Sequence, residues 1–237
     1  MAPFNFGTRA VRMPDARDQF GSRKSAWWIG AVMAVALLWC DGALAAEPRV
    51  LLLRGWLNLF SAGLDRLADE LRARGIKAEV RRHLYWTTAV TDILRDRAAG
   101  NVGPLILVGH SQGGNDAIEI AHALQVSHVP VDLVVTLAPY MPKPIPANVG
   151  RAINYYQAGG WGSPLTPESG FPGKLSNFDL AGDPTIFHFN IDNNDRIHAE
   201  ILREIQAFQR LEPGRRGKPA RTARVGVEAK LARVFCD

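Results

Sequence analysis

The sequence predicts an α/β fold in which a mainly parallel sheet of about six strands is covered by helices on both faces. Two observations lead to this prediction. After Glu47, short apolar runs of strand length alternate with amphipathic stretches, which is the pattern of successive strand–helix units. The chain has 237 residues, enough for one such domain with a sizeable core, and we detect no internal repeat in it. We therefore expect a three-layer architecture without a second domain.

The expected strands are apolar runs that recur along the chain, each bounded by polar, glycine or proline residues. They lie at Val50–Leu53, Ala78–Arg82, Leu105–Val108, Val131–Leu137, Ala152–Tyr156 and Leu175–Leu180.

Three helices are predicted from apolar side chains that recur every three or four residues. The first covers Leu64 to Leu71 and ends at Gly75. The second includes Ile118 to Gln125, and the third runs from about Asn194 to Arg210.

The N-terminal residues have the composition of a secretory signal. A basic segment ending at Lys24 precedes an apolar run from Ala26 to Cys40, and the small residues around Ala45 follow. We expect a signal peptide over residues 1–45, cleaved after Ala45, and a protein exported to the periplasm or out of the cell. The alternative is an anchor in the inner membrane, but the apolar run is shorter than the roughly 20 residues that a membrane span needs.

The positive charge is concentrated at the two ends of the chain. Lys and Arg exceed Asp and Glu by five to two in residues 1–24 and by eight to three in residues 210–237, whereas acidic residues prevail in between. We expect an α/β domain over 46–211 and a basic, mostly disordered tail over 212–237 that could contact an anionic envelope surface. Aromatic residues do not alternate with the basic ones in the tail, so nucleic-acid binding is not expected.

Cysteine usage and motif spacing predict no cofactor. Cys40 and Cys236 are the only cysteines, and cleavage after Ala45 would remove the first of them. The mature chain, expected to be a monomer, then has neither a disulfide nor a thiolate metal site. We find no metal-ligand spacing and no nucleotide-binding fingerprint.

A nucleophile motif follows the apolar strand that ends at Val108. Residues Gly109 to Gly113 read Gly-His-Ser-Gln-Gly, which matches G-x-S-x-G between a strand and a helix. The sharp turn requires almost no side chain two residues before and two after Ser111, and glycine occupies both places. A phosphate-binding loop is not favoured, because the required lysine is missing.

In these features the chain resembles the α/β-hydrolases, especially compact bacterial lipases and esterases without a cap domain. The resemblance extends from about Val50 to Arg210. It rests on Gly109–Gly113, on the early loop Arg54-Gly55-Trp56, and on His188 ahead of the last helix. It implies transfer of an acyl group to water through a covalent acyl-serine.

The resemblance also implies two backbone donors for an oxyanion. One is the N–H of Gln112, the residue after the nucleophile, and the other comes from the loop after the first strand. Trp56 is our candidate there, with Leu57 next. Many family members have His-Gly in this loop, whereas this chain has Arg54-Gly55.

Six histidines compete for the role of general base. His188 precedes the closing helix, at the position where the family places it. His198 also lies downstream of Ser111, but inside the last predicted helix, where we expect it on the helix surface. His110 adjoins the serine, and its side chain is expected to point elsewhere.

The acid of a catalytic triad is not determined by the sequence. The loop after the fourth strand, Ala138-Pro139-Tyr140, has no carboxylate, and the loop after the fifth offers only Glu168. Asp179 is our choice, because it lies at the carboxyl end of the last short strand. Glu168, Asp183 and a dyad without an acid remain alternatives.

The function expected from these residues is hydrolysis of a small or medium acyl ester, of a small molecule or a lipid, by a serine esterase or lipase. Trp56 and Leu57 lie next to the proposed oxyanion loop, and Tyr140, Met141 and Trp161 offer further apolar surface for an acyl chain. Ester, thioester and amide substrates are not separated. The alternative is a catalytically silent fold that binds at the cell envelope.

Overall fold

The structure is a computed structural model that describes residues 47–56 and 61–209. The expected signal or anchor segment, Leu57, both cysteines and the basic tail lie outside the described residues. Among the helices of the described part, none has the length and apolar composition of a membrane span.

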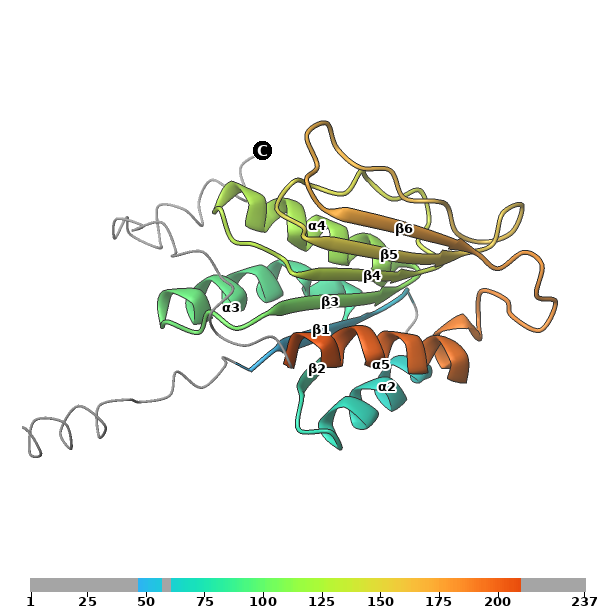
Figure 1. The fold of residues 1–237 in the computed structure, drawn as a ribbon, viewed down its shortest axis with the longest axis horizontal. Coiled ribbons are helices and arrows are strands. Elements are labelled where there is room, and N and C mark those ends of the chain that lie inside the picture. Colours follow the sequence, from blue (N-terminus) through green and yellow to red (C-terminus); the bar gives the residue numbers. More distant parts are fainter. Residues whose placement is uncertain (1–46, 57–60, 210–237) are drawn as a thin grey trace, which may run out of the picture. The chain divides into compact units, whose positions relative to one another are not determined.

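The core of the domain is a six-stranded sheet in the order β2-β1-β3-β4-β5-β6, and every neighbouring pair is parallel (Figure 1). The strands start and end within two residues of the expected positions. They are β1 (Arg49–Arg54), β2 (Lys77–Arg82), β3 (Leu105–His110), β4 (Leu133–Leu137), β5 (Arg151–Tyr156) and β6 (Lys174–Asp179).

Helices cover both faces of this sheet, which confirms the expected three-layer α/β architecture. Alternate side chains of β1 show the division: Val50 and Leu52 pack in one apolar cluster, Leu51 and Leu53 in the other. The first cluster includes the apolar stripes of α2 (Ala62–Arg72) and α5 (Asp195–Gln209). The second includes those of α3 (Trp86–Ala98) and α4 (Gln112–Val126).

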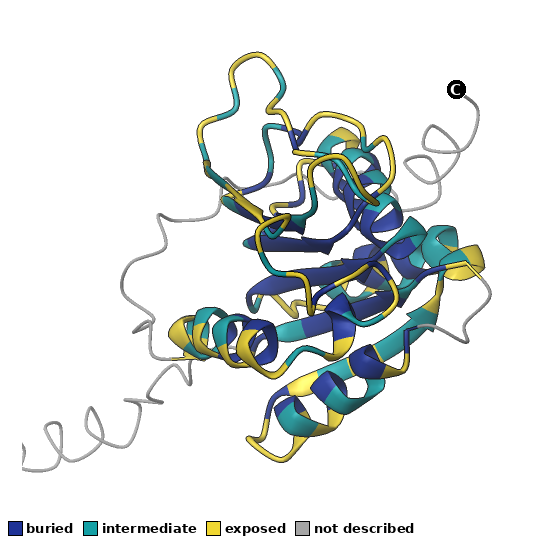
Figure 2. Cartoon of the chain, turned by 90° about the vertical axis from the view of Figure 1, so that its right-hand side faces the viewer, coloured by how far each residue is buried: buried dark blue, intermediate teal, exposed yellow. Residues whose placement is uncertain are grey.

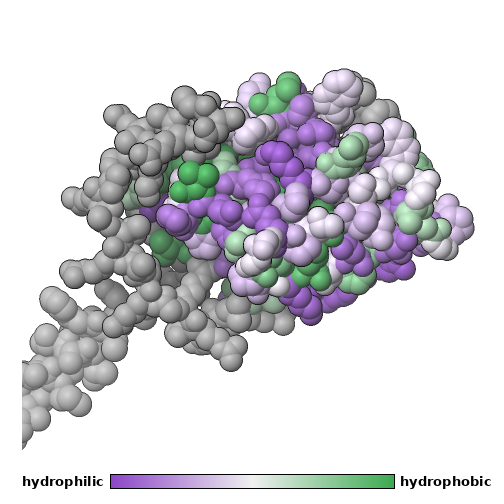
Figure 3. All heavy atoms as spheres, turned by 90° about the horizontal axis from the view of Figure 1, so that it is seen from above, coloured by the Kyte–Doolittle hydropathy of each residue, from purple (hydrophilic) through white to green (hydrophobic). Residues whose placement is uncertain are grey.

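Burial follows the same layers. In Figure 2 the central strands are buried, while the helices alternate between buried and exposed residues along their length. The face of the domain in Figure 3 is mostly hydrophilic, with scattered hydrophobic residues, as expected where amphipathic helices and loops meet water.

Helix α5 begins as the sequence predicted, and a short 3₁₀ turn (Ile191–Asn193) precedes it. The Asn194 side-chain oxygen accepts hydrogen bonds from the amides of Arg196 and Ile197, which caps the helix. Helix α2 has no such cap of its own. Its Gly63 amide donates instead to the Asp192 carboxylate, 2.9 Å away, so the starts of α2 and α5 are tied together.

His198 does not lie on the helix surface as expected. It is only 2% exposed, and its Nε2 lies 2.6 Å from the Asp192 carbonyl oxygen. The reason is its place beside Ile197 in the stripe that packs toward the 3₁₀ turn. This contact gives His198 a structural position away from Ser111.

Candidate active site

Ser111 occupies a strained turn between β3 and α4. Its backbone has φ 56° and ψ −123°, a conformation that side chains disfavour. A Cβ on Gly109 would collide with the carbonyl group of Gly113, and one on Gly113 would collide with that of Leu53. The Ser111 amide donates to the Leu137 carbonyl oxygen over 2.8 Å. These contacts explain the glycines of the motif and hold the serine at the carboxyl end of the sheet.

His188 reaches Ser111 from the segment between β6 and α5. Its Nε2 lies 3.1 Å from the Ser111 Oγ, within hydrogen-bond distance. His188 is 6% exposed, and its ring lies against Trp161, with ring centroids 5.0 Å apart. The structure therefore brings together the two residues that the sequence analysis nominated as nucleophile and base.

The electrostatics of His188 favour a neutral ring. Burial, together with the nearby His110, lowers the pKa of His188 to about 4. A neutral imidazole that accepts the Ser111 proton at Nε2 must carry its own proton on Nδ1. That Nδ1 is buried and has no hydrogen-bond partner among the described residues.

Asp179 does not supply the expected partner for this Nδ1. Its Oδ1 accepts hydrogen bonds from the amides of Ala158 and Ala181, both at 3.0 Å, and these bonds lower the pKa of Asp179. The carboxylate ends the β6 strand and faces the loop after β5. Our expectation that Asp179 orients His188 is therefore not met by the geometry.

The alternative acids also have other partners. The Glu168 carboxylate accepts a 3.3 Å hydrogen bond from the Gln125 side-chain Nε2 and lies 3.5 Å from the His122 Nδ1. Asp183 accepts hydrogen bonds from the backbone and hydroxyl of Thr185. Within residues 47–56 and 61–209, the arrangement is thus a serine–histidine dyad.

The loop after β1 lies directly against the nucleophile. A Cβ on Gly55 would lie 3.0 Å from the Ser111 Cβ, so no larger residue fits without a shift. The Gly55 amide donates to the Ser61 Oγ, 3.1 Å away, which makes it a poor oxyanion donor. Trp56 remains the candidate in this loop, and Gln112, as the first residue of α4, has an amide without an acceptor inside its helix.

A cavity of about 400 Å³ opens above Ser111. Aromatic side chains form much of its wall, and several of them are largely exposed, among them Trp56 at 70% and Trp161 at 57%. Its lining includes Gly55, Trp56, Ser61, His83, His110, Ser111, Gln112, Tyr140, Trp161, His188 and Phe189.

Three polar side chains at or behind this cavity, His83, His110 and Asp116, were not expected there from the sequence. His83 and His110 both line it, and Asp116 lies behind His83 with 3.7 Å between the carboxylate and the His83 Nδ1. Burial raises the pKa of Asp116 to about 7. The available signal was the position of Asp116, one turn into the helix that begins directly after Ser111.

Comparisons with known proteins give only distant matches. No family model matches the chain, and no curated protein matches its sequence. A structure from Xanthomonas campestris pv. campestris, assigned to the alpha/beta superfamily of hydrolases, is 18% identical and matches 68% of this chain and 95% of its own, with a TM-score of 0.34.

Two further structures cover similar shares. A protein from Pectobacterium atrosepticum, assigned as a YdeN-like hydrolase, is 14% identical over 70% of this chain and 95% of its own, with a TM-score of 0.42. One described under LipS and LipT, two metagenome-derived lipolytic enzymes, is 12% identical over 69% and 95%, also with a TM-score of 0.42. At these identities and TM-scores, the matches transfer neither an activity nor a residue role to this chain.

Proposed function

We propose that this protein is a serine hydrolase that cleaves a small or medium acyl ester with Ser111 as nucleophile and His188 as general base. The observation that carries the proposal is the 3.1 Å contact between the Ser111 Oγ and the His188 Nε2 on a strained turn. Strain of this kind costs about 1–3 kcal/mol and is typical of catalytic nucleophiles. A binding protein with a silent site, the competing proposal, would have no use for it.

The reaction follows from the geometry of the dyad. The Ser111 Oγ attacks the acyl carbon while its proton passes to the His188 Nε2. The negative charge on the carbonyl oxygen is held by backbone N–H groups, for which Trp56 and Gln112 are the candidates. When the C–O bond to the alcohol breaks, the alcohol leaves with the proton from His188. Water then repeats the sequence and releases the acid and free Ser111.

The cavity supports an apolar acyl group. Trp56, Tyr140, Trp161 and Phe189 surround the serine with aromatic surface, on which a hydrocarbon chain can pack. The rest of the lining is mostly polar and includes His83 and Gln112.

Covalent labelling with a fluorophosphonate probe tests the proposal. The wild-type chain should be labelled and should hydrolyse short p-nitrophenyl esters, whereas Ser111→Ala should not be labelled at all. Ser127→Ala is the matched control, because the Ser127 hydroxyl is largely buried and has no hydrogen-bond partner in the described part of the chain. Unchanged ester cleavage in Ser111→Ala would refute the proposal.

The expected loss of turnover in Ser111→Ala is smaller than in a complete triad. Removing the serine of a triad costs about 10⁶ in kcat, and removing the acid alone costs about 10⁴. In a dyad without an acid, about a hundredfold of the acceleration therefore depends on Ser111, and Ser111→Ala should lower kcat by about this factor. His188→Ala should cause a similar loss, and His198→Ala should lower the melting temperature instead, because it removes a buried hydrogen bond.

We further propose that the enzyme acts outside the cytoplasm and that its basic tail contacts an anionic surface of the cell envelope. The basic and apolar residues 1–45 and the Lys and Arg residues of 212–237 support this proposal. Mass spectrometry of the mature protein tests the first part, with an N-terminus at Ala46 as the expected result. Peptides spanning Trp27 to Glu47 in the mature protein would favour the membrane anchor.

A further inference from the structure

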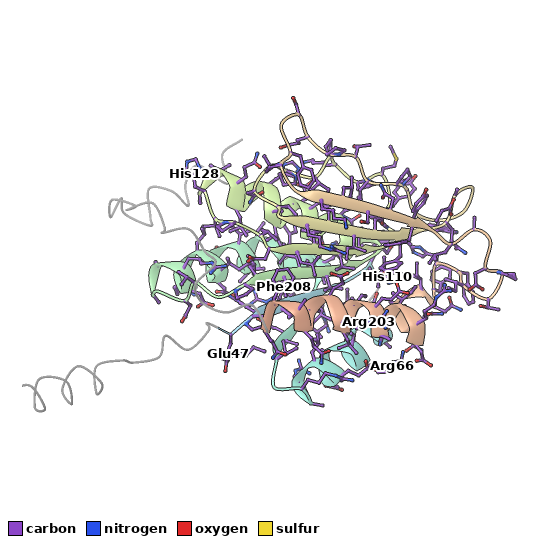
Figure 4. The ribbon with its side chains drawn as sticks, viewed as in Figure 1. Glu47, Arg66, His110, His128, Arg203 and Phe208 are labelled. Atoms are coloured by element: carbon purple, nitrogen blue, oxygen red, sulfur yellow. The ribbon has the colours of Figure 1, made fainter. Side chains whose placement is uncertain are left out.

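His110 links three parts of the candidate active site through a chain of hydrogen bonds. Its Nε2 lies 2.8 Å from the His188 carbonyl oxygen, and its Nδ1 lies 2.9 Å from the Ser61 Oγ. Ser61 in turn accepts the Gly55 amide over 3.1 Å. His110 itself precedes Ser111 in the turn, and Figure 4 shows it at the carboxyl end of the sheet.

The partners determine where each proton lies. A carbonyl oxygen only accepts, so the His110 Nε2 must carry a hydrogen and donate to His188. A neutral ring then has a lone pair on Nδ1, which accepts the Ser61 hydroxyl proton. The Ser61 oxygen remains free to accept from Gly55. Every donor in the chain therefore has one acceptor, and only the Nε2–H tautomer of His110 satisfies this arrangement.

Burial keeps this ring neutral. His110 is 1% exposed, and burial lowers its pKa to about 4. Its ring centroid lies 5.1 Å from that of His188. A charged His110 at this distance would oppose the positive charge that His188 acquires when it takes the serine proton. The neutral tautomer thus serves the base as well as the hydrogen-bond chain.

We propose that His110 is a positioning residue that aligns the His188 base and the Gly55 loop with Ser111. The proposal rests on the proposed hydrolase function. The His188 Nδ1 has no hydrogen-bond partner in the described part of the chain, so no side chain fixes the ring there. The position of His188 depends instead on the hydrogen bond that the His110 Nε2 donates to its backbone carbonyl. The same side chain holds, through Ser61, the loop that contains the oxyanion candidate Trp56.

Three substitutions of His110 separate its two hydrogen bonds. Gln places an amide donor near the position of Nε2, Asn places an oxygen near the position of Nδ1, and Phe fills the ring volume with neither group. If the bond to His188 aligns the base, His110→Phe and His110→Asn should lower kcat and the rate of fluorophosphonate labelling by up to about 10², with a small change in KM. His110→Gln should recover most of this loss.

Tyr155→Phe is the control for a general loss of stability. It removes a 2.8 Å hydrogen bond to Glu200 that lies on another part of the sheet. It should lower the melting temperature without changing the labelling rate. Equal labelling of folded wild-type, Phe, Asn and Gln proteins would overturn the inference. No labelling of the wild-type protein would overturn the proposed function instead, so the two failures are distinguishable.

A measurement on the unmodified protein tests the proton positions even if the variants fold poorly. Nitrogen-15 NMR of labelled histidine should show His110 as the neutral Nε2–H tautomer from pH 5 to pH 8. A proton on Nδ1, or a positively charged ring at pH 6, would contradict the hydrogen-bond chain and with it the positioning role.

Discussion

If the proposed function holds, lowering the pH from 7 to 5 should leave the rate of ester hydrolysis almost unchanged, because His188 stays neutral over this range. A general base works only in its unprotonated form, so the acid limb of kcat/KM reports its pKa. Burial and the nearby His110 lower the pKa of His188 to about 4, and no carboxylate in the described residues stabilises the charged ring.

The size of the effect follows from the neutral fraction of the ring. With a pKa of about 4, roughly 90% of His188 is neutral at pH 5. With the ordinary pKa of about 6.5, only about 3% would be neutral at pH 5, compared with about 75% at pH 7. The activity at pH 5 should therefore be about 90% of that at pH 7, whereas an unperturbed histidine would retain about 4%.

The assay is hydrolysis of a p-nitrophenyl ester at low substrate concentration, read at the isosbestic wavelength of the product. Circular dichroism at each pH should show that the protein stays folded. An acid limb with its midpoint between pH 6 and pH 7 would refute the reasoning. It would mean that a carboxylate reaches His188 in the working enzyme, or that water reaches the ring.

Three further predictions concern the acids and the turn. Replacing Asp179 by Asn or Glu168 by Gln should change kcat less than about threefold, because neither carboxylate contacts His188. A loss of kcat near 10⁴ in either variant would show that the replaced carboxylate is the acid of a catalytic triad. Asp116→Asn should stabilise the fold at pH 8 by up to about 4 kcal/mol and have little effect at pH 4. The pKa of Asp116 is about 7 in the folded protein, compared with 3.8 in the unfolded chain. Between these values the folded protein keeps a proton that the unfolded chain has lost, so the stability of the wild type falls as the pH rises through this window. Equal differences in melting temperature between variant and wild type at pH 4 and pH 8 would contradict this. Gly113→Ala should prevent accumulation of folded protein, since its Cβ would collide with the carbonyl of Leu53. Gly182→Ala is the control, because the space around Gly182 is open, and this variant should express and melt like the wild type.

The strand pattern and the nucleophile turn could be predicted from the sequence because each has a short, recognisable motif. Apolar runs between polar segments define the buried strands. Gly109 is required by the nearby Gly113 carbonyl, within the turn, and Gly113 by the close approach of the Leu53 carbonyl in β1. The place of His188 ahead of the last helix was expected from the resemblance to α/β-hydrolases, and its Nε2 lies 3.1 Å from the Ser111 Oγ.

Other features depend on long-range contacts that leave no pattern in the sequence. Helix α3 was not singled out, because Thr87, Thr88 and Thr91 weaken its helical propensity and its burial depends on packing against α4. Asp179 looked like a triad acid by position along the chain, yet its orientation is set by the amides of Ala158 and Ala181.

Because 77 positions separate Ser111 from His188, we expect the candidate site to form late in folding. Helix α5 follows His188 and packs, through Ile197, Ile201 and Ile205, in the same apolar cluster as the first strand. Contacts of such large sequence separation form slowly, because the intervening chain must be ordered before they stabilise it. A growing or partly unfolded chain would therefore contain Ser111 without His188, and the contact between the two would form only after both ends of the domain have come together.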